Sequence, residues 1–223
     1  MTGVAIRGGD GVFRSPGMPA NRSIAYFDKQ FEQQVRDREF RLNPFEELAI
    51  PFLHGRVLDL GCGMGNLTIE AARRGCSVLA LDSSAAAIER IRKVASEETL
   101  SIQACRTDLK RYDISGDFDV VVSIGLLMFF DCPRAYHMLG DMQNHVAEGG
   151  HAIVNVLSEE TTYLDMFDAE SHCLFARHEL ENRFHDWQVL VSEHRDFDAP
   201  GQSKKAFSTV IARKPCVPAC VHT

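Results

Sequence analysis

The sequence predicts an α/β protein with a doubly wound, mostly parallel seven-stranded sheet that carries an antiparallel hairpin at one edge. Three observations predict this fold. Between residues 56 and 157, short apolar runs alternate with helical patterns, which is typical of parallel strands joined by crossover helices. A glycine-rich turn follows the first apolar run. The last two strand-like runs have no helix between them, which indicates a hairpin.

The N-terminal part is expected to precede the sheet as a lead-in and a helical cap. Residues 1–22 are rich in glycine, proline and small polar residues and are expected to be flexible. From Ser23, apolar residues recur at three- and four-residue spacing, so residues 23–54 are expected to form a helical cap. Asn43 followed by Pro44 is typical of the start of a helix.

Five strands and three helices are expected to alternate along the central part of the chain. The strands are "RVLDL", "SVLALD", "LSIQACRTD", "FDVVVSI" and "HAIVNVLS". The helices are "NLTIEAARRG", "SAAAIERIRKVA" and "PRAYHMLGDMQNHVAEGG", the last of which is expected to stop at its two glycines. "ELENRFHD" predicts a short helix, and "WQVLVSEHR" and "AFSTVIARK" predict the hairpin. We expect one domain over residues 23–214 and a flexible, cysteine-containing tail over residues 215–223.

Composition limits the classes of partner. The chain of 223 residues carries 31 acidic side chains against 24 lysines and arginines, a formal net charge of -7. This balance argues against nucleic acid or an anionic membrane as partner and favours a small molecule. No apolar run approaches the roughly 20 residues that span a bilayer, and no secretory signal is visible. The seven cysteines are an odd number without zinc-like pairs, which favours a reducing cytoplasm. A monomer or a homodimer is expected.

The segment "VLDLGCGMGNLT" is the strongest local signal for a ligand site. Alternate glycines after a buried strand indicate a backbone that something approaches closely. A P-loop is excluded because no Gly-Lys-Ser/Thr follows. The dinucleotide pattern G-x-G-x-x-G also fits poorly, because Asn66 stands where the third glycine would be. This spacing disfavours an NAD-dependent oxidoreductase.

Acidic residues at three successive strand ends accompany the glycines. Asp59 lies within the first strand, where an unpaired carboxylate would be costly, so it is expected to accept loop amides or to orient a cationic ligand. Asp82 ends the second strand, where a carboxylate can accept the two hydroxyls of a ribose. Asp108 ends the third strand, where it can meet an adenine amino group. The set predicts a site for an adenosine that bears a cationic, zwitterionic tail.

These motifs resemble the class I S-adenosylmethionine-dependent methyltransferases, with their Rossmann-like fold, over roughly residues 23–213. "VLDLGCGMGNLT", "VLALDSS", "CRTDL", "FDVVVSIGLLMFF" and "VAEGGHAIVNVL" follow that family's order of motifs. The resemblance implies S-adenosylmethionine as cofactor, S-adenosylhomocysteine as product and no metal. It also implies cofactor contacts from a set of residues in these motifs and before them: Asp59, Gly61, Gly63, Gly65, Asp82, Ser83, Asp108, Leu109, Ser123, Ile124, Tyr26 and Arg41.

A closer likeness is to the tellurite-resistance (TehB-like) methyltransferases. "AYFDKQF", "LLMFF" and "LFARHELENRFHDWQVL" resemble that family's start, central segment and late helix. The resemblance implies that Arg177, His178 and Arg183 supply positive donors to an oxyanion such as tellurite or selenite, or act on a soft thiol-like nucleophile. The spacing of these basic residues is not clearly that of the family.

Other interpretations remain open. The chain could methylate an organic metabolite at oxygen or nitrogen, which needs a general base that the sequence does not reveal. It could also bind the cofactor without turnover. "LLMFF" could exclude water or simply pack in the core, and Cys62 is expected to pack. His137 and His145 are expected to be surface or structural residues, and Cys216, Cys220 and His222 to lie in a disordered tail.

Overall fold

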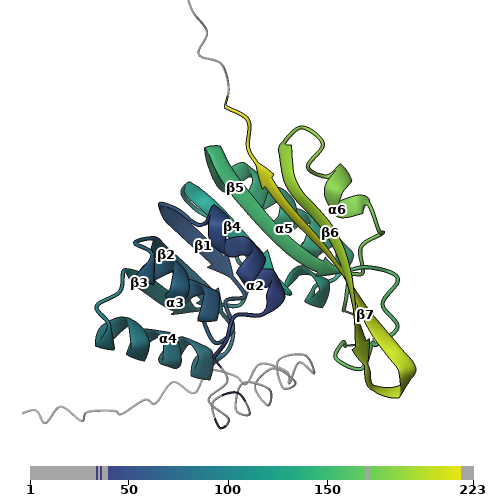
Figure 1. Ribbon diagram of the computed structural model, residues 1–223, viewed down its shortest axis with the longest axis horizontal. Helices are drawn as coiled ribbons and strands as arrows, with labels where there is room; N and C mark the ends of the chain where they lie inside the picture. The colour runs from purple at the N-terminus through teal and green to yellow at the C-terminus, as the bar shows by residue number, and fades with distance from the viewer. Residues whose placement is uncertain (1–33, 35, 37–39, 169–170, 217–223) are drawn as a thin grey trace, which may run out of the picture.

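The computed structural model describes residues 34, 36, 40–168 and 171–216, and in this part of the chain seven strands form one sheet in the order β3-β2-β1-β4-β5-β7-β6 (Figure 1). The strands are β1 (Arg56–Leu60), β2 (Ser77–Asp82), β3 (Ile102–Arg106), β4 (Phe118–Ile124), β5 (Val146–Leu157), β6 (Gln188–Ala199) and β7 (Ser203–Arg213). The first five pair in parallel, whereas β7 pairs antiparallel with both β5 and β6. The predicted fold class is confirmed.

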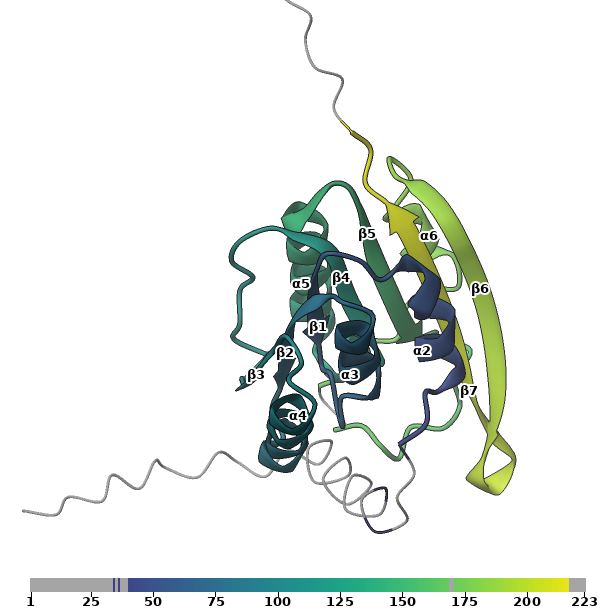
Figure 2. The same cartoon turned by 60° about the vertical axis from the view of Figure 1, so that its left-hand side comes forward.

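Helices cover both faces of the sheet (Figures 1 and 2). On one face lie α2 (Pro44–Ala49), the short 3-10 turn Ile50–Phe52, α3 (Asn66–Arg73) and α4 (Ala85–Glu97). On the other lie α5 (Cys132–His145) and α6 (Glu179–Asn182), with a 3-10 turn at Leu127–Phe129 before α5. A last 3-10 turn, Pro200–Gln202, joins β6 to β7. Each face therefore has its own apolar core.

The start of α2 follows the expected helix signals. Asn43 is the N-cap, and its side-chain oxygen accepts the backbone N–H groups of Phe45 and Glu46. The Glu46 carboxylate accepts the Asn43 N–H in return over 2.7 Å, which completes a capping box. These bonds fix the first turn of α2, and with it the positions of Phe45 and Glu46.

The end of α5 differs from the prediction. The helix was expected to run to Gly149 and Gly150, but it ends at His145, and β5 begins at Val146. The Nζ of Lys214 donates to the carbonyls of Gln143 and Val146, so a distant lysine satisfies the end of the helix. Both glycines lie within β5, and a Cβ on Gly150 would lie 2.5 Å from the Asp119 carbonyl oxygen.

The cysteines differ from the prediction. Cys132 and Cys173 form a disulfide, which differs from the free thiols expected in a reducing compartment.

In the described residues, no helix is long and apolar enough to cross a membrane. Residues 1–33 and 217–223 lie outside the described residues, as do the predicted lead-in, Tyr26, Cys220 and His222, so the expected behaviour of both ends stays a prediction.

Candidate active site

A cavity of about 830 Å³ opens at the carboxyl ends of β1, β2 and β4 and extends to the β6–β7 hairpin. β1 stands between β2 and β4, so the chain order reverses here, which is where open α/β sheets bind ligands. The volume lies in the range of roughly 300–1,000 Å³ typical of small-molecule sites. A second hollow, of about 570 Å³, lies at the hairpin turn and contains none of the predicted site residues.

The glycine loop forms one wall of this cavity. Gly61, Gly63 and Gly65 all have positive φ, at +71°, +50° and +77°, a conformation that other residues adopt only under strain. A Cβ on Gly61 would lie 3.1 Å from Leu126, and one on Gly65 would lie 2.3 Å from Ile91. Gly61 and Gly63 line the cavity, whereas Gly65 is the N-cap of α3 and is not among the residues that line it.

Asp59 is buried beneath the loop. Its Oδ2 accepts the Thr68 hydroxyl at 2.5 Å, so a side chain of α3 satisfies part of this carboxylate. Burial raises the pKa of Asp59 to about 6; the Thr68 hydrogen bond opposes this shift, and the nearby Asp82 adds to it. The same environment raises the pKa of the Cys62 thiol well above its ordinary value. Cys62 is therefore a poor nucleophile at neutral pH, in agreement with a packing role.

Asp82 is buried at the end of β2 and holds the loop. Its Oδ2 accepts the Gly63 N–H at 2.9 Å, and its Oδ1 accepts the Ser84 N–H at 2.8 Å. Asp108, after β3, accepts the Lys110 N–H at 3.1 Å. Both acids line the cavity, so the described structure brings the three predicted acids to one site.

Most of the predicted cofactor residues meet in this cavity. Those that line it are Asp59, Gly61, Gly63, Asp82, Ser83, Asp108, Leu109, Ile124 and Arg41. Ser123 is fully buried in β4 and is not among the lining residues. Its hydroxyl has no partner in the described residues. The cofactor roles of the individual residues stay predictions.

The half of the cavity beyond the loop has a mostly apolar wall, of which the sequence indicated only the "LLMFF" segment. Phe45 of α2 contacts Phe207 of β7 and Phe197 of β6, with ring centroids 4.8 and 5.7 Å away. Met128, Phe129, Leu157 and Met166 line the same half. We call Phe45, Phe197 and Phe207 the aromatic wall. No local sequence pattern indicates this wall, because α2 and the hairpin are far apart in the sequence but adjacent in space (Figure 2).

Polar side chains also line this half, among them Glu46, Lys205 and Asn155. Glu46 lines the cavity half-buried, and burial, with a smaller contribution from Asp59, raises its pKa to about 7 against an opposing hydrogen bond from the Asn43 N–H. Lys205 lines it from β7, and burial lowers the pKa of its ammonium group. Asn155 of β5 is buried, and its Oδ1 has no partner in the described residues. No signal near these residues in the sequence distinguished them from surface or core positions.

The three predicted catalytic residues lie elsewhere, outside the described lining of the cavity. Arg177 forms an ion pair with Glu160 at 2.7 Å, and Arg183 pairs with Glu179 at 3.0 Å. His178 is exposed near Glu181. These pairings are what a surface with mixed charges shows, and the catalytic role of the three residues stays a prediction.

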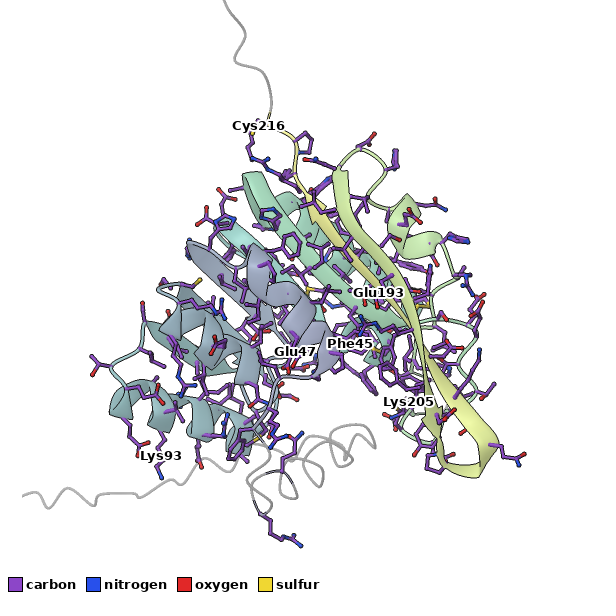
Figure 3. The ribbon with its side chains drawn as sticks, viewed as in Figure 1. Phe45, Glu47, Lys93, Glu193, Lys205 and Cys216 are labelled. Carbon is purple, nitrogen blue, oxygen red and sulfur yellow. A yellow bond between two sulfur atoms is a disulfide. The ribbon has the colours of Figure 1, made fainter. Side chains whose placement is uncertain are left out.

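The other histidines have local partners. His137 lies 3.3 Å from Asp113, and His145 lies 3.1 Å from Asp141 on its own helix. No group of three or more potential metal ligands occurs in the described part of the chain. The free Cys216 is exposed beyond β7 (Figure 3).

Residues 57–150, which include the glycine loop and all three acids, match the model of the family described as "Methyltransferase domain". Two curated relatives are a "Hemagglutinin 1" of Eikenella corrodens, 28% identical over 170 residues, and a "Probable S-adenosyl-L-methionine-dependent methyltransferase TehB" of Haemophilus influenzae, 27% identical over 166. The matches cover 72% and 71% of this chain but only 55% and 57% of the relatives, so the chain spans little more than half of their length.

Two solved structures share the fold. TehB from Haemophilus influenzae has a TM-score of 0.68 at 22% identity, over 86% of this chain and 67% of its own. The N-methyltransferase NodS from Bradyrhizobium japonicum, in complex with S-adenosyl-L-homocysteine, has a TM-score of 0.68 at 15% identity, over 88% of this chain and 100% of its own. The family match, the strand order and the hydrogen bond from the glycine loop to Asp82 all indicate the same family. The chain belongs to the class I S-adenosylmethionine-dependent methyltransferases.

Proposed function

We propose that the protein transfers the methyl group of S-adenosylmethionine to a small organic molecule that binds in the apolar half of the cavity. One observation carries the proposal: a single cavity joins the glycine loop and its acids to the aromatic wall. A cofactor and an acceptor can therefore lie side by side in one water-poor space. Such placement is the main requirement of a direct transfer between two bound molecules.

The cofactor end suits the predicted ligand. Glycine at positive φ keeps side chains out of this wall of the cavity, and a Cβ on Gly61 would press against Leu126 at 3.1 Å. S-adenosylmethionine would supply an activated methyl group on a positively charged sulfur. Asp82 and Asp108 would hold its ribose and adenine, and Asp59 with Arg41 its methionine part.

Glu46 is the group in this cavity best suited to accept a proton. A pKa of about 7 means that a substantial fraction is ionised near neutral pH, while the group still binds a proton well. When the acceptor bonds to the methyl carbon, the carbon–sulfur bond breaks and its electron pair stays on sulfur. The proton that an oxygen or nitrogen acceptor loses passes to the Glu46 carboxylate. Glu46 would thus serve as the base that the organic-metabolite interpretation requires.

A chalcogen oxyanion or a thiol remains the second candidate, favoured by the resemblance to TehB. An oxyanion needs several positive donors around it. Lys205 is the cation that the hairpin contributes to the described lining. The other lining cations are Arg41, assigned above to the cofactor, Lys110, which donates to the Ser171 hydroxyl, and Arg111, which lies 3.9 Å from Asp108. Arg177, His178 and Arg183 lie outside the described lining. These placements favour the organic acceptor. We further propose that the protein is cytoplasmic, that it is a monomer or a homodimer, and that residues 23–54 form a helical cap.

Two measurements test the proposal. Calorimetric titration with S-adenosylmethionine, S-adenosylhomocysteine and NAD should show micromolar binding of the first two only. If NAD bound and the sulfonium did not, the cofactor assignment would be lost. Formation of S-adenosylhomocysteine is then measured with small phenols, amines and carboxylates, and with tellurite, selenite and simple thiols, with headspace mass spectrometry for volatile products. Cofactor binding without turnover on any acceptor would indicate a regulator.

A further inference from the structure

We propose that the methyl acceptor is a small organic anion with an apolar body, and that Lys205 binds its anionic group against the aromatic wall. The inference rests on the proposed function and names the substrate class of the same site. A carboxylate and a phosphate share the required chemistry, a compact anion that an ammonium group can approach.

The register of the hairpin places Lys205 within the aromatic wall. Lys205 is directly opposite Phe197 on the neighbouring strand and two residues before Phe207 on its own strand. Opposed residues of an antiparallel pair, and residues two apart on one strand, share a face of the sheet. All three side chains therefore leave the hairpin on the face that meets Phe45 of α2, and Figure 3 shows Phe45 and Lys205 in this region.

Lys205 has no acidic partner among the described residues, and its neighbour shows the contrast. Lys204, on the opposite face, donates to Asp196 over 2.8 Å. The Nζ of Lys205 lies 5.0 Å from the centre of the Tyr163 ring, a contact with a π face. Asp198 also lines the cavity, but it is paired in register with Lys204 and so leaves the strand on the other face.

A partly buried ammonium group without a carboxylate is costly, and the lowered pKa of Lys205 has that burial as its cause. An anionic ligand in the cavity would offset this cost, because it would replace lost water with a charge-assisted hydrogen bond. The rings of Phe45, Phe197 and Phe207 line the same cavity as Lys205 and give it an apolar surface. A ligand that satisfies both needs has a charged end and an apolar body.

Asn155 adds a requirement on the ligand. Its Nδ2 donates to the Thr209 hydroxyl at 2.9 Å, and its buried Oδ1 has no partner in the described residues. Asn155 lines the same cavity, so the Oδ1 is available to accept an N–H or O–H group of a bound molecule. This is the kind of group that would carry the methyl-accepting atom.

A pair of probes of the same shape tests the role of charge. Naphthalene-2-carboxylate and naphthalene-2-carboxamide are titrated calorimetrically into the full chain saturated with S-adenosylhomocysteine. We expect the carboxylate to bind at least about tenfold more tightly than the amide, since hydrogen bonds to charged groups are worth that much or more. Lys205→Met should reduce this preference to within about twofold, and Lys205→Arg should retain it. The matched control, Lys204→Met, should leave it unchanged.

Each contrary result is informative. Equal affinity for the two probes, a preference that survives in Lys205→Met, or no binding of either probe to a protein that binds S-adenosylhomocysteine would overturn the inference. None of these results affects the cofactor assignment. Failure of the proposed function would appear instead as loss of S-adenosylmethionine binding, or as no turnover on any acceptor. Thermal denaturation of each variant, with and without S-adenosylhomocysteine, separates loss of the probe site from loss of folding.

Discussion

The backbone N–H of Gly63 donates to the Asp82 carboxylate at 2.9 Å, so the acid that ends β2 holds the loop that follows β1. The same carboxylate accepts the Ser84 N–H, at the start of α4. One side chain thereby couples the first two strand-to-helix turns at the point where the order of the strands reverses. The loop geometry and the predicted ribose contact depend on the same residue.

Asp82→Ala should therefore weaken the binding of S-adenosylmethionine by about 1–3 kcal/mol, because it removes charge-assisted hydrogen bonds and frees the loop. Calorimetric titration gives the affinity. Asp117→Ala is the matched control, since Asp117 is exposed and does not line the cavity. Unchanged affinity in Asp82→Ala would exclude Asp82 from the cofactor site.

Gly65→Ala should destabilise the protein by about 3 kcal/mol. The new Cβ would lie 2.3 Å from the Cγ1 of Ile91, and the residue has a φ of +77°. Left-handed strain alone costs about 1–2 kcal/mol, and overpacking adds to it. Gly201→Ala is the control, because Gly201 has a φ of +72° but nothing within 4 Å of a Cβ, and it should cost only the strain. Urea denaturation of both variants measures the difference; equal losses would show that Ile91 moves aside freely.

The stability of the ligand-free protein should fall as the pH rises from about 4.5 to about 7. Glu46 has a folded-state pKa of about 7 against an ordinary value of 4.5, so the folded state binds more protons across this window. Unfolding free energy then decreases with pH and levels off above the folded-state pKa. Asp59, with a pKa raised to about 6, contributes in the same direction.

Glu46→Gln should flatten this pH dependence in part. Asp59 still contributes in the same direction, and His151, whose pKa is lowered mainly by burial, contributes in the opposite one. Glu47→Gln, which changes the exposed neighbour in the same helical turn, should leave the slope as it is. Chemical denaturation at a series of pH values measures both. A slope that does not differ between wild type and Glu46→Gln would contradict the raised pKa, and with it the support for Glu46 as the base.

Removal of the disulfide should cost about 4 kcal/mol of stability, since Cys132 and Cys173 close a loop with a sequence separation of 41 residues. The bond joins the start of α5 to a segment whose Cys173 N–H donates to the Met128 carbonyl, beside the cavity. The double variant Cys132→Ser, Cys173→Ser and the reduced wild type should unfold at the same lowered denaturant concentration. A wild type insensitive to reductant would show that this bond does not form in solution.

The sequence predicted the strands and the cofactor loop because both depend on local patterns. Buried parallel strands need continuous apolar runs, and the loop needs glycine at positive φ, so both appear as short motifs. The predicted C-terminal end of α5 was wrong because the carbonyls there are satisfied by Lys214, about 70 positions away, and Gly150 serves the close approach of β5 to β4.

The acceptor end of the site could not be predicted for a related reason. Phe45, Phe197 and Phe207 come from α2 and from the two strands of the hairpin, and only the fold brings them together. Glu46 had a local explanation as a helix-capping residue, which is correct but incomplete, because the same carboxylate also lines the cavity. Lys205 differs from Lys204 only by the face of the strand on which it lies.

The roles of the basic residues near α6 can be separated from those of the cavity by mutation. Arg177→Ala should lower stability by at most about 1 kcal/mol, because an exposed ion pair contributes little. Arg183→Ala should cost more, because the Arg183 guanidinium also lies 4.0 Å from the centre of the Tyr136 ring. Both should retain S-adenosylmethionine binding and turnover on whichever acceptor the wild type methylates, whereas Glu46→Gln should reduce turnover strongly when the acceptor loses a proton. Rates of S-adenosylhomocysteine formation give the comparison. If the arginine variants lost turnover while Glu46→Gln kept it, the basic residues would be the catalytic groups, and the acceptor would be an oxyanion or soft nucleophile that needs positive donors rather than a base.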